Sequence, residues 1–178
     1  MTVLPPKPAE IVQLAAASAS RAFSALVDRP VEPFHAGVTS GLELSELSSM
    51  AWERGVVFEL QGAVEGGVAL LFSSSQRDAL VARMLGADES DAGDGSGESA
   101  LMEVANIVVS HVVSEIAEVS GQRLLPSVPT LIARRATGPL DQIVEGRESG
   151  IELHRCALSD AQGELGGALL LLTAGPLA

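Results

Sequence analysis

Residues 98–116 have the sequence ESALMEVANIVVSHVVSEI, which combines a long apolar helix pattern with two isolated polar side chains. With about 100° of rotation per residue, one face of such a helix is apolar and is predicted to contact a core. That face comprises Leu101, Ala105, Val108, Val109, Val112, Ile116 and Val119. A polar stripe about 80° wide lies on the other side, and it comprises Ser99, Glu103, Asn106, Ser110 and Ser114. The pattern predicts a helix over about 98–120 that points Glu103 and Asn106 away from the core.

The composition of the 178-residue chain is that of a globular protein, with 47% hydrophobic and 19% charged residues. A net charge of −12 argues against nucleic-acid binding, because contacts to phosphates need clustered Lys and Arg. The single cysteine, Cys156, allows neither an internal disulfide nor a zinc site built on cysteine pairs. No signal peptide is seen in MTVLPPKPAEI, and the runs VALLF and GALLLLTAG are too short to cross a bilayer. We therefore expect a cytoplasmic protein that binds neither nucleic acid nor membrane.

Two similar sets of elements follow one another along the chain. The first set is a helix over 8–27, two strands joined by a turn at 65–67, and a helix over 75–86 with Ser75 as N-cap and Gly86 as stop. A Gly- and acid-rich linker over 87–97 precedes the second set. That set is the helix over 98–120, an extended segment over 123–136, and strands over 150–158 and 166–173.

The two sets can be aligned, which indicates an internal duplication with pseudo-repeats at about 8–86 and 98–173. VFEL at 57–60 aligns with GIEL at 150–153, EGGVALLF at 65–72 with LGGALLLL at 165–172, and Glu10 with Glu103. We predict one α+β domain over 1–178, in which the duplicated helix–strands–helix units share an antiparallel-type sheet with two long helices on the surface. The second unit lacks a counterpart of the 75–86 helix, so the chain is expected to be a monomer or a weak dimer.

Taken alone, the Glu103–Asn106 pair is typical of a solvated helix face. The sequence holds no P-loop, no H-E-x-x-H and no G-x-S-x-G turn, and its acidic linker does not follow the calcium-loop pattern. The neighbouring Ser110 and Ser114 are small, however, where a solvated stripe usually carries long charged side chains. A stripe of small residues would let the backbone or a helix of a partner approach closely.

The spacing Ser99-x3-Glu103-x2-Asn106-x22-Pro129 resembles the signature of the CheC, CheX and FliY family, and the duplicated layout is most similar to CheC. These proteins are phosphatases of the phosphorylated chemotaxis response regulator CheY. The resemblance implies a CheC-like fold, with Asn106 positioning the attacking water and Glu103 binding a lysine of the receiver. Ser99 and Pro129 would be structural, helping to start the helix and to shape the following strand. The resemblance implies that the chain has no cofactor of its own, because Mg²⁺ belongs to the receiver. It also allows a CheD-like deamidase as a further partner.

The first half departs from this signature. It has Pro6-x3-Glu10-x2-Gln13, with Ala36 at the position of Pro129. Glutamine keeps the amide but adds a methylene, and a displacement of about 1 Å can cost about 100-fold in rate. We therefore expect Glu10 and Gln13 to form a degenerate second site that is weak or inactive. The alternatives to a phosphatase are a receiver-binding adaptor without catalysis and a FliM-type structural protein of the flagellar switch on the same scaffold.

Overall fold

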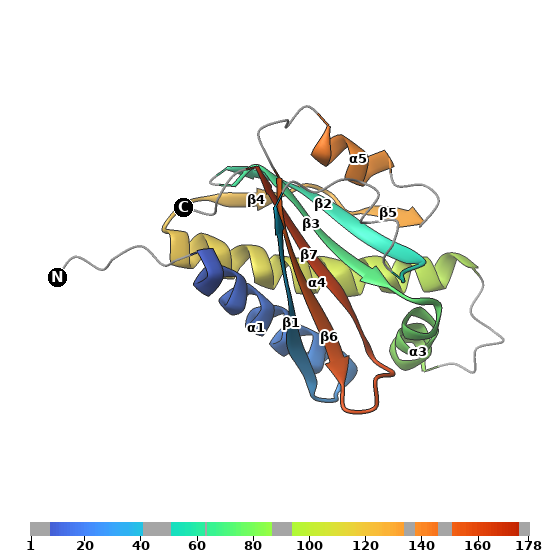
Figure 1. Ribbon diagram of the computed structural model, residues 1–178. Coiled ribbons are helices and arrows are strands. Elements are labelled where there is room, and N and C mark those ends of the chain that lie inside the picture. Colours follow the sequence, from blue (N-terminus) through green and yellow to red (C-terminus); the bar gives the residue numbers. More distant parts are fainter. Residues whose placement is uncertain are drawn as a thin grey trace.

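The computed structural model describes residues 8–40, 51–62, 64–86, 94–133, 138–145 and 151–174. Seven strands form one sheet, with helices packed on it (Figure 1). The first half contains α1 (Pro8–Val27), β1 (Val31–Ser40), β2 (Arg54–Gly62), β3 (Gly66–Phe72) and α3 (Ser74–Leu85). The second half contains α4 (Asp94–Ser120), β4 (Leu124–Pro126), β5 (Thr130–Ala133), α5 (Gly138–Val144), β6 (Ile151–Asp160) and β7 (Gly166–Ala174).

The strands of the two halves are interleaved in the sheet. The order is β1-β6-β7-β3-β2-β4, β5 also pairs with β2, and every pairing is antiparallel. The hairpins β2–β3 and β6–β7 meet at the centre through β3 and β7, and the first strands of each half lie at the edges. Neither half has a sheet of its own, so both contribute to one core. The predicted α+β fold with a shared antiparallel sheet is confirmed.

The two long helices α1 and α4 lie side by side on one face of the sheet (Figure 1). Their apolar faces and the strands beneath them form the larger core. On α4 this face is fully buried from Leu101 to Ile116, as the periodicity predicts, with Val104 and Val113 added to it and Val119 only half-buried. Residues Gly95–Ser120 are long and apolar enough to span a bilayer by composition, but half of an apolar 18-residue window within them is buried against the protein. A core helix of a soluble protein passes the same test, so this is weak support for a membrane span.

The opposite face of the sheet carries α5, a helix that the sequence did not predict (Figure 1). Its buried residues Leu140 and Ile143 pack into a second, smaller apolar cluster with Trp52, Leu71 and Leu170. The expected extended segment over 123–136 is two short strands, β4 and β5, and nothing in its pattern indicated a helix after it. With α5 in place, both faces of the sheet contribute buried apolar residues.

Two helix starts differ from the predicted ones. Ser73, not Ser75, is the N-cap of α3, because its hydroxyl accepts the Gln76 N–H and the Gln76 side chain accepts the Ser73 N–H in return. Gly86 ends that helix with φ 62°, as predicted. Helix α4 begins at Asp94, so it takes in the last residues of the expected linker. The remainder of that linker, 87–93, lies outside the described residues.

One detail of the repeat alignment is wrong. Leu60, in VFEL, pairs with Gly66 next to the β2–β3 turn. Leu153, in GIEL, pairs with Leu172 at the end of its hairpin remote from the β6–β7 turn. The two tetrapeptides therefore occupy different positions, whereas Gly66–Gly67 and Gly166–Gly167 each begin the second strand of a hairpin. The duplication itself stays a prediction.

Candidate functional site

The polar stripe of α4 faces solvent along its whole length. Every one of its members, Ser99, Glu103, Asn106, Ser110 and Ser114, is exposed. Among the described residues, neither the Glu103 carboxylate nor the Asn106 carboxamide has a hydrogen-bond or ion-pair partner. The buried face of α4 holds the backbone behind them in place. The two groups are thus presented one turn apart on the outer face of α4, and no other described residue binds them.

Two serines of the stripe bond to the helix itself. Ser110 Oγ donates to the Asn106 carbonyl at 2.6 Å, and Ser99 Oγ donates to the Gly95 carbonyl at 2.9 Å. Such bonds to the carbonyl one turn back fold the hydroxyl against the helix and keep the side chain short. The expectation that Ser99 helps to start the helix is wrong, because α4 begins at Asp94 and Ser99 lies in its second turn.

Pro129 lies in the break between β4 and β5 at the edge of the sheet. Before it, the Ser127 N–H donates to the Glu59 carbonyl at 2.8 Å and the Ser127 hydroxyl accepts from the Glu59 N–H at 2.9 Å. Proline has no N–H to add to the ladder, so the edge strand is interrupted there. The neighbouring Val128 is 80% exposed.

The edge strands β4 and β5 both contact α4. A strand advances about 3.3 Å per residue and a helix about 1.5 Å. The length of chain from Gly121 to Pro129 therefore roughly matches α4 from Gly121 back to Asn106. This estimate brings Pro129 to about the level of Asn106 along the helix axis.

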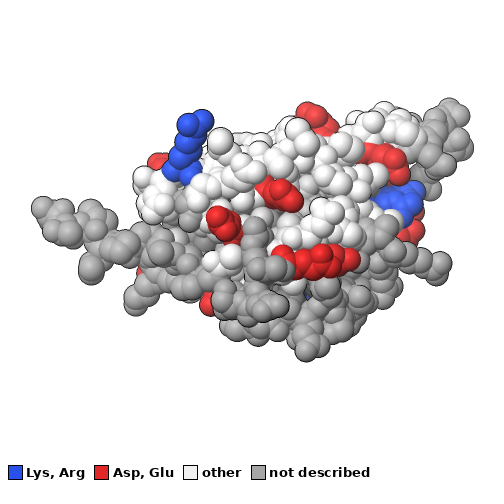
Figure 2. Space-filling model, turned by 90° about the horizontal axis from the view of Figure 1, so that it is seen from above, with Lys and Arg blue, Asp and Glu red and all other residues white. Residues whose placement is uncertain are grey.

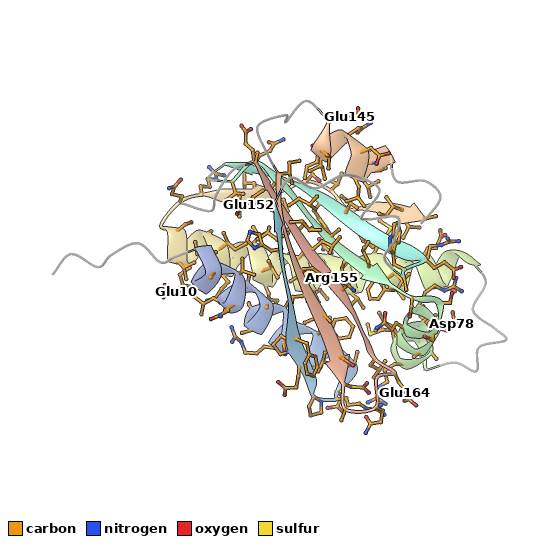
Figure 3. The ribbon with its side chains drawn as sticks, in the orientation of Figure 1. Glu10, Asp78, Glu145, Glu152, Arg155 and Glu164 are labelled. Carbon is orange, nitrogen blue, oxygen red and sulfur yellow. The ribbon has the colours of Figure 1, made fainter. Side chains whose placement is uncertain are left out.

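The first-half pair, Glu10 and Gln13, is also exposed, on α1. Figure 3 labels Glu10 near the N-terminal end of that helix. Helices α1 and α4 run antiparallel (Figure 1), and they touch where Ser18 Oγ donates to the His111 carbonyl at 3.2 Å. Glu10 lies about 12 Å before Ser18 along the axis of α1, and Glu103 lies about 12 Å before His111 along the axis of α4. The two pairs therefore lie about 24 Å apart, at opposite ends of the helix pair. Pro6 lies outside the described residues, and Ala36 lies in β1.

The charge around the α4 site is negative. Among the described residues, the outer faces of α1 and α4 carry Glu10, Glu98, Glu103, Glu115 and Glu118, and Arg21 is their one cation. On the opposite face, most of the charged side chains in view are also acidic, with few Lys or Arg among them (Figure 2). No group of three or more His, Cys, Asp or Glu side chains that could hold a metal is found within the described ranges.

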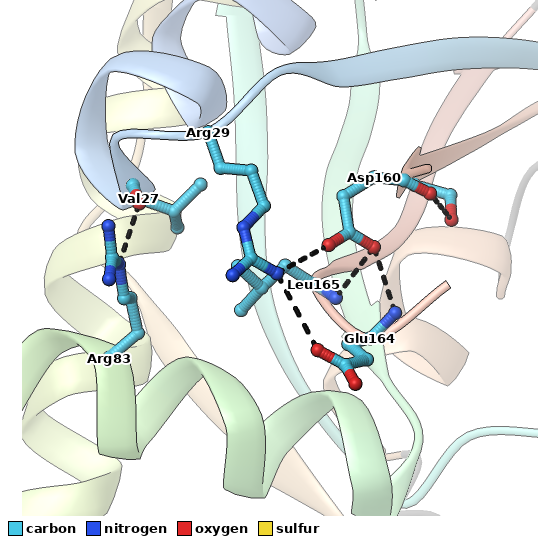
Figure 4. A network of polar contacts seen from close by, with 7 residues as sticks. Val27, Arg29, Arg83, Asp160, Glu164 and Leu165 are labelled. Carbon is cyan, nitrogen blue, oxygen red and sulfur yellow. Dashed lines mark hydrogen bonds and ion pairs between the residues drawn. The ribbon is translucent and has the colours of Figure 1, made fainter. Parts of the chain in front are cut away.

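The best-connected charges lie away from this site, where the α1–β1 turn meets the β6–β7 hairpin (Figure 4). Buried Asp160 binds Arg29 Nη1 at 3.0 Å and accepts the Glu164 and Leu165 N–H groups at 2.8 and 3.1 Å. Burial alone would raise the pKa of Asp160, but the hydrogen bonds from Arg29, Leu165 and Glu164 outweigh it and hold the pKa below its usual value. Nothing in the sequence pattern indicated this network, which ties α1 to the second hairpin.

Two further groups with reactive side chains are buried in β6. Burial raises the pKa of the Cys156 thiol, which disfavours the nucleophilic thiolate. His154 is 4% exposed, and its Nε2 lies 3.5 Å from Glu152 Oε2. Neither residue shares a surface with Glu103 and Asn106.

Residues 97–132 match the model of the CheC-like family. They contain Ser99, Glu103, Asn106 and Pro129, together with the helix and edge strand that position them. The predicted resemblance to the CheC, CheX and FliY family is confirmed. Among curated proteins, no sequence matches the chain.

Solved structures show that the CheC-like fold extends over nearly the whole chain. FliY of Thermotoga maritima superposes with a TM-score of 0.73 at 17% identity, over 97% of this chain and 91% of FliY. The CheX–CheY–BeF3–Mg²⁺ complex of Borrelia burgdorferi gives 0.62 at 16%, over 92% of this chain and 96% of the matched one. The FliM middle domain of Vibrio alginolyticus gives 0.64 at 12%, over 95% and 93%. Chemotaxis proteins and a FliM domain thus share this fold.

Proposed function

We propose that this CheC-like chain is a cytoplasmic phosphatase that hydrolyses the aspartyl-phosphate of a CheY-like receiver. The observation that carries the proposal is the exposed Glu103–Asn106 pair, which has no partner among the described residues and lies inside the segment that matches the CheC-like family. The complex of Borrelia burgdorferi CheX with CheY supports a receiver as the partner.

An aspartyl-phosphate is a reactive mixed anhydride, so what its hydrolysis lacks is a well-oriented water. The Asn106 carboxamide both donates and accepts hydrogen bonds, and it can hold a water in line with the bond to be broken. The water oxygen attacks phosphorus, the bond between phosphorus and the aspartate oxygen breaks, and the products are inorganic phosphate and a free carboxylate. The Mg²⁺ of the receiver balances the phosphoryl charge, so this chain supplies geometry alone.

Glu103 has a different role in this proposal. Its carboxylate lies one turn before Asn106 and binds a lysine of the receiver through a charge-assisted hydrogen bond. The bond fixes the angle at which α4 approaches the phosphoryl group, and therefore where the Asn106 amide lies. The exposed, small Ser110 next to the pair leaves room for the receiver backbone. A CheD-like deamidase is a further partner that this proposal admits.

The test follows phosphate release from a CheY-like receiver of the same organism after phosphorylation with acetyl phosphate. The protein is expected to accelerate release, and Asn106→Ala and Glu103→Ala are each expected to lower that acceleration about 100-fold. Glu145→Ala, an exposed change at the end of α5 on the opposite face of the sheet, serves as the control and leaves the rate unchanged. Acceleration that survives in Asn106→Ala would contradict the proposal.

A FliM-type structural role is the second candidate, because the FliM middle domain shares the fold. It predicts that the protein binds a receiver without accelerating phosphate release. An adaptor predicts the same binding with preference for the phosphorylated form. Binding measured alongside hydrolysis separates both from an enzyme.

A further inference from the structure

A groove of about 480 Å³ runs between the outer sides of α1 and α4. Small residues line much of it, including Ala22 and Ala25 on α1 and Ser114 on α4. It also contains Ile107, which follows Glu103 by one helical turn on the same side of α4. Along α4 the groove extends from Ile107, one turn after Glu103, to Glu118, and its α1 side is formed by the C-terminal part of that helix.

The charges along the groove are unbalanced. Arg21 Nη2 on α1 lies 3.5 Å from Glu115 Oε2 on α4, so these two charges compensate each other across the groove. Glu118 lines the far end and is exposed, without an ion-pair partner among the described residues. Glu103 lies just beyond the near end and is equally unpaired. The two carboxylates are about 22 Å apart along α4, with Glu118 in the groove and Glu103 one turn before its first α4 residue, Ile107.

We infer that this groove binds a helix of the receiver that carries basic side chains. The inference rests on the proposed function and names the surface by which the partner is selected. A third helix fits between two others when small side chains let it approach to about 8–10 Å. Basic groups on it would compensate Glu118 and the carboxylates nearby. Recognition at Glu118 lies too far from Asn106 to touch the reacting atoms, so it sets affinity and not the chemical step.

A second copy of this chain is a poorer occupant of the same groove. Two such faces in contact would bring the carboxylates of α1 and α4 together, in a protein of net charge −12. Like charges placed across an interface oppose association. A partner with a positive docking face gains from the same arrangement, and its association should weaken as salt screens the attraction.

The experiment compares Glu118→Lys with Glu145→Lys as the matched control. Glu145 is exposed at the end of α5 on the opposite face of the sheet, so its reversal changes the net charge equally (Figure 3). In the hydrolysis assay, Glu118→Lys is expected to raise KM about fivefold with kcat unchanged and to flatten the dependence on salt. Ala25→Arg, which places a cationic side chain in the groove, is expected to act in the same direction.

Equal KM values for Glu118→Lys, Ala25→Arg and Glu145→Lys would overturn the inference while leaving the proposed function intact. Binding of the receiver loaded with beryllium fluoride and Mg²⁺ gives a readout that needs no hydrolysis. If Asn106→Ala retains that binding and Glu118→Lys weakens it, the groove binds the receiver even where catalysis fails. A dimer in sedimentation equilibrium that Glu118→Lys abolishes would assign the groove to a second copy and overturn the inference.

Discussion

The two long helices present the same kind of surface but different chemistry. On each, a glutamate and an amide side chain lie one turn apart and exposed, over an apolar face that is buried in the shared core. The amide is asparagine on α4 and glutamine on α1. In the proposed mechanism, the position of this single amide decides whether such a surface can orient a water.

The two glutamates also differ in how much each stabilises its helix. Glu10 lies in the first turn of α1, where a carboxylate interacts favourably with the helix dipole and stabilises the helix start. Glu103 lies well inside α4, where the dipole gives it no such benefit. Helix stability therefore accounts for Glu10, whereas Glu103 lacks a structural explanation. This asymmetry favours the α4 pair as the active one.

The sharpest test of the comparison exchanges the amides. Asn106→Gln is expected to lower receiver dephosphorylation about 100-fold, because the extra methylene moves the carboxamide by about 1 Å and adds a rotatable bond. Initial rates of phosphate release at saturating receiver measure the effect. Gln13→Ala is the control on α1 and should leave the rate within about twofold of the unmodified protein. A fully active Asn106→Gln variant would show that amide position does not separate the two helices.

The two hairpins offer a second contrast, in stability. The β6–β7 turn is tied to α1 through buried Asp160, whereas the exposed Glu65 at the β2–β3 turn holds Ala174 through its backbone carbonyl. Asp160→Asn is expected to lower the free energy of unfolding by about 2 kcal/mol at pH 7, because hydrogen bonds to a charged acceptor are lost. Glu65→Gln should change it by less than about 0.5 kcal/mol. Denaturant unfolding followed by circular dichroism measures both.

The Asp160 effect should depend on pH in a defined direction. Its pKa is lowered on folding, so the stabilisation is complete above the unfolded pKa of about 3.9 and is lost as the pH falls through the lower folded value. The difference between the unmodified protein and Asp160→Asn should therefore narrow as the pH drops from about 5 toward 2. A difference that stays constant over this range would contradict the assignment of the effect to the ionised carboxylate.

The polar stripe allows a third test. Ser110 is small and exposed beside Asn106, so Ser110→Trp is expected to obstruct the receiver and to raise KM about tenfold. Gln13→Trp, an equally exposed change on α1, should leave KM unchanged. Far-ultraviolet circular dichroism checks that both variants fold. Equal effects of the two tryptophans would indicate that the receiver contacts both helices alike.

The sequence predicted the features that depend on local pattern. The periodicity of 98–120 predicts the buried and exposed faces of α4. The glycine pairs Gly66–Gly67 and Gly166–Gly167 predict where β3 and β7 begin. Helix α5 was missed because seven residues hold too few turns for a periodic signal. Ser73, Ser74 and Ser75 are equivalent as caps in sequence, and the side chain of Gln76 selects the first. Arg29 and Asp160 meet only through the fold, since 131 positions separate them.

The smallest expected effect is a gain of activity at Glu10 and Gln13, the pair on α1 that we predict to be a degenerate site. Gln13→Asn shortens the amide of α1 to the length found on α4, which should raise phosphate release about twofold if Glu10 then orients the receiver as Glu103 does. The measurement is made in the Asn106→Ala background, where the α4 site contributes little and a new activity is visible. The edge strand near α1 has Ala36 where the α4 signature has Pro129, so this strand is not shaped as it is beside α4. No gain in that background would mean that the amide alone is insufficient and that the edge strand also determines the active site.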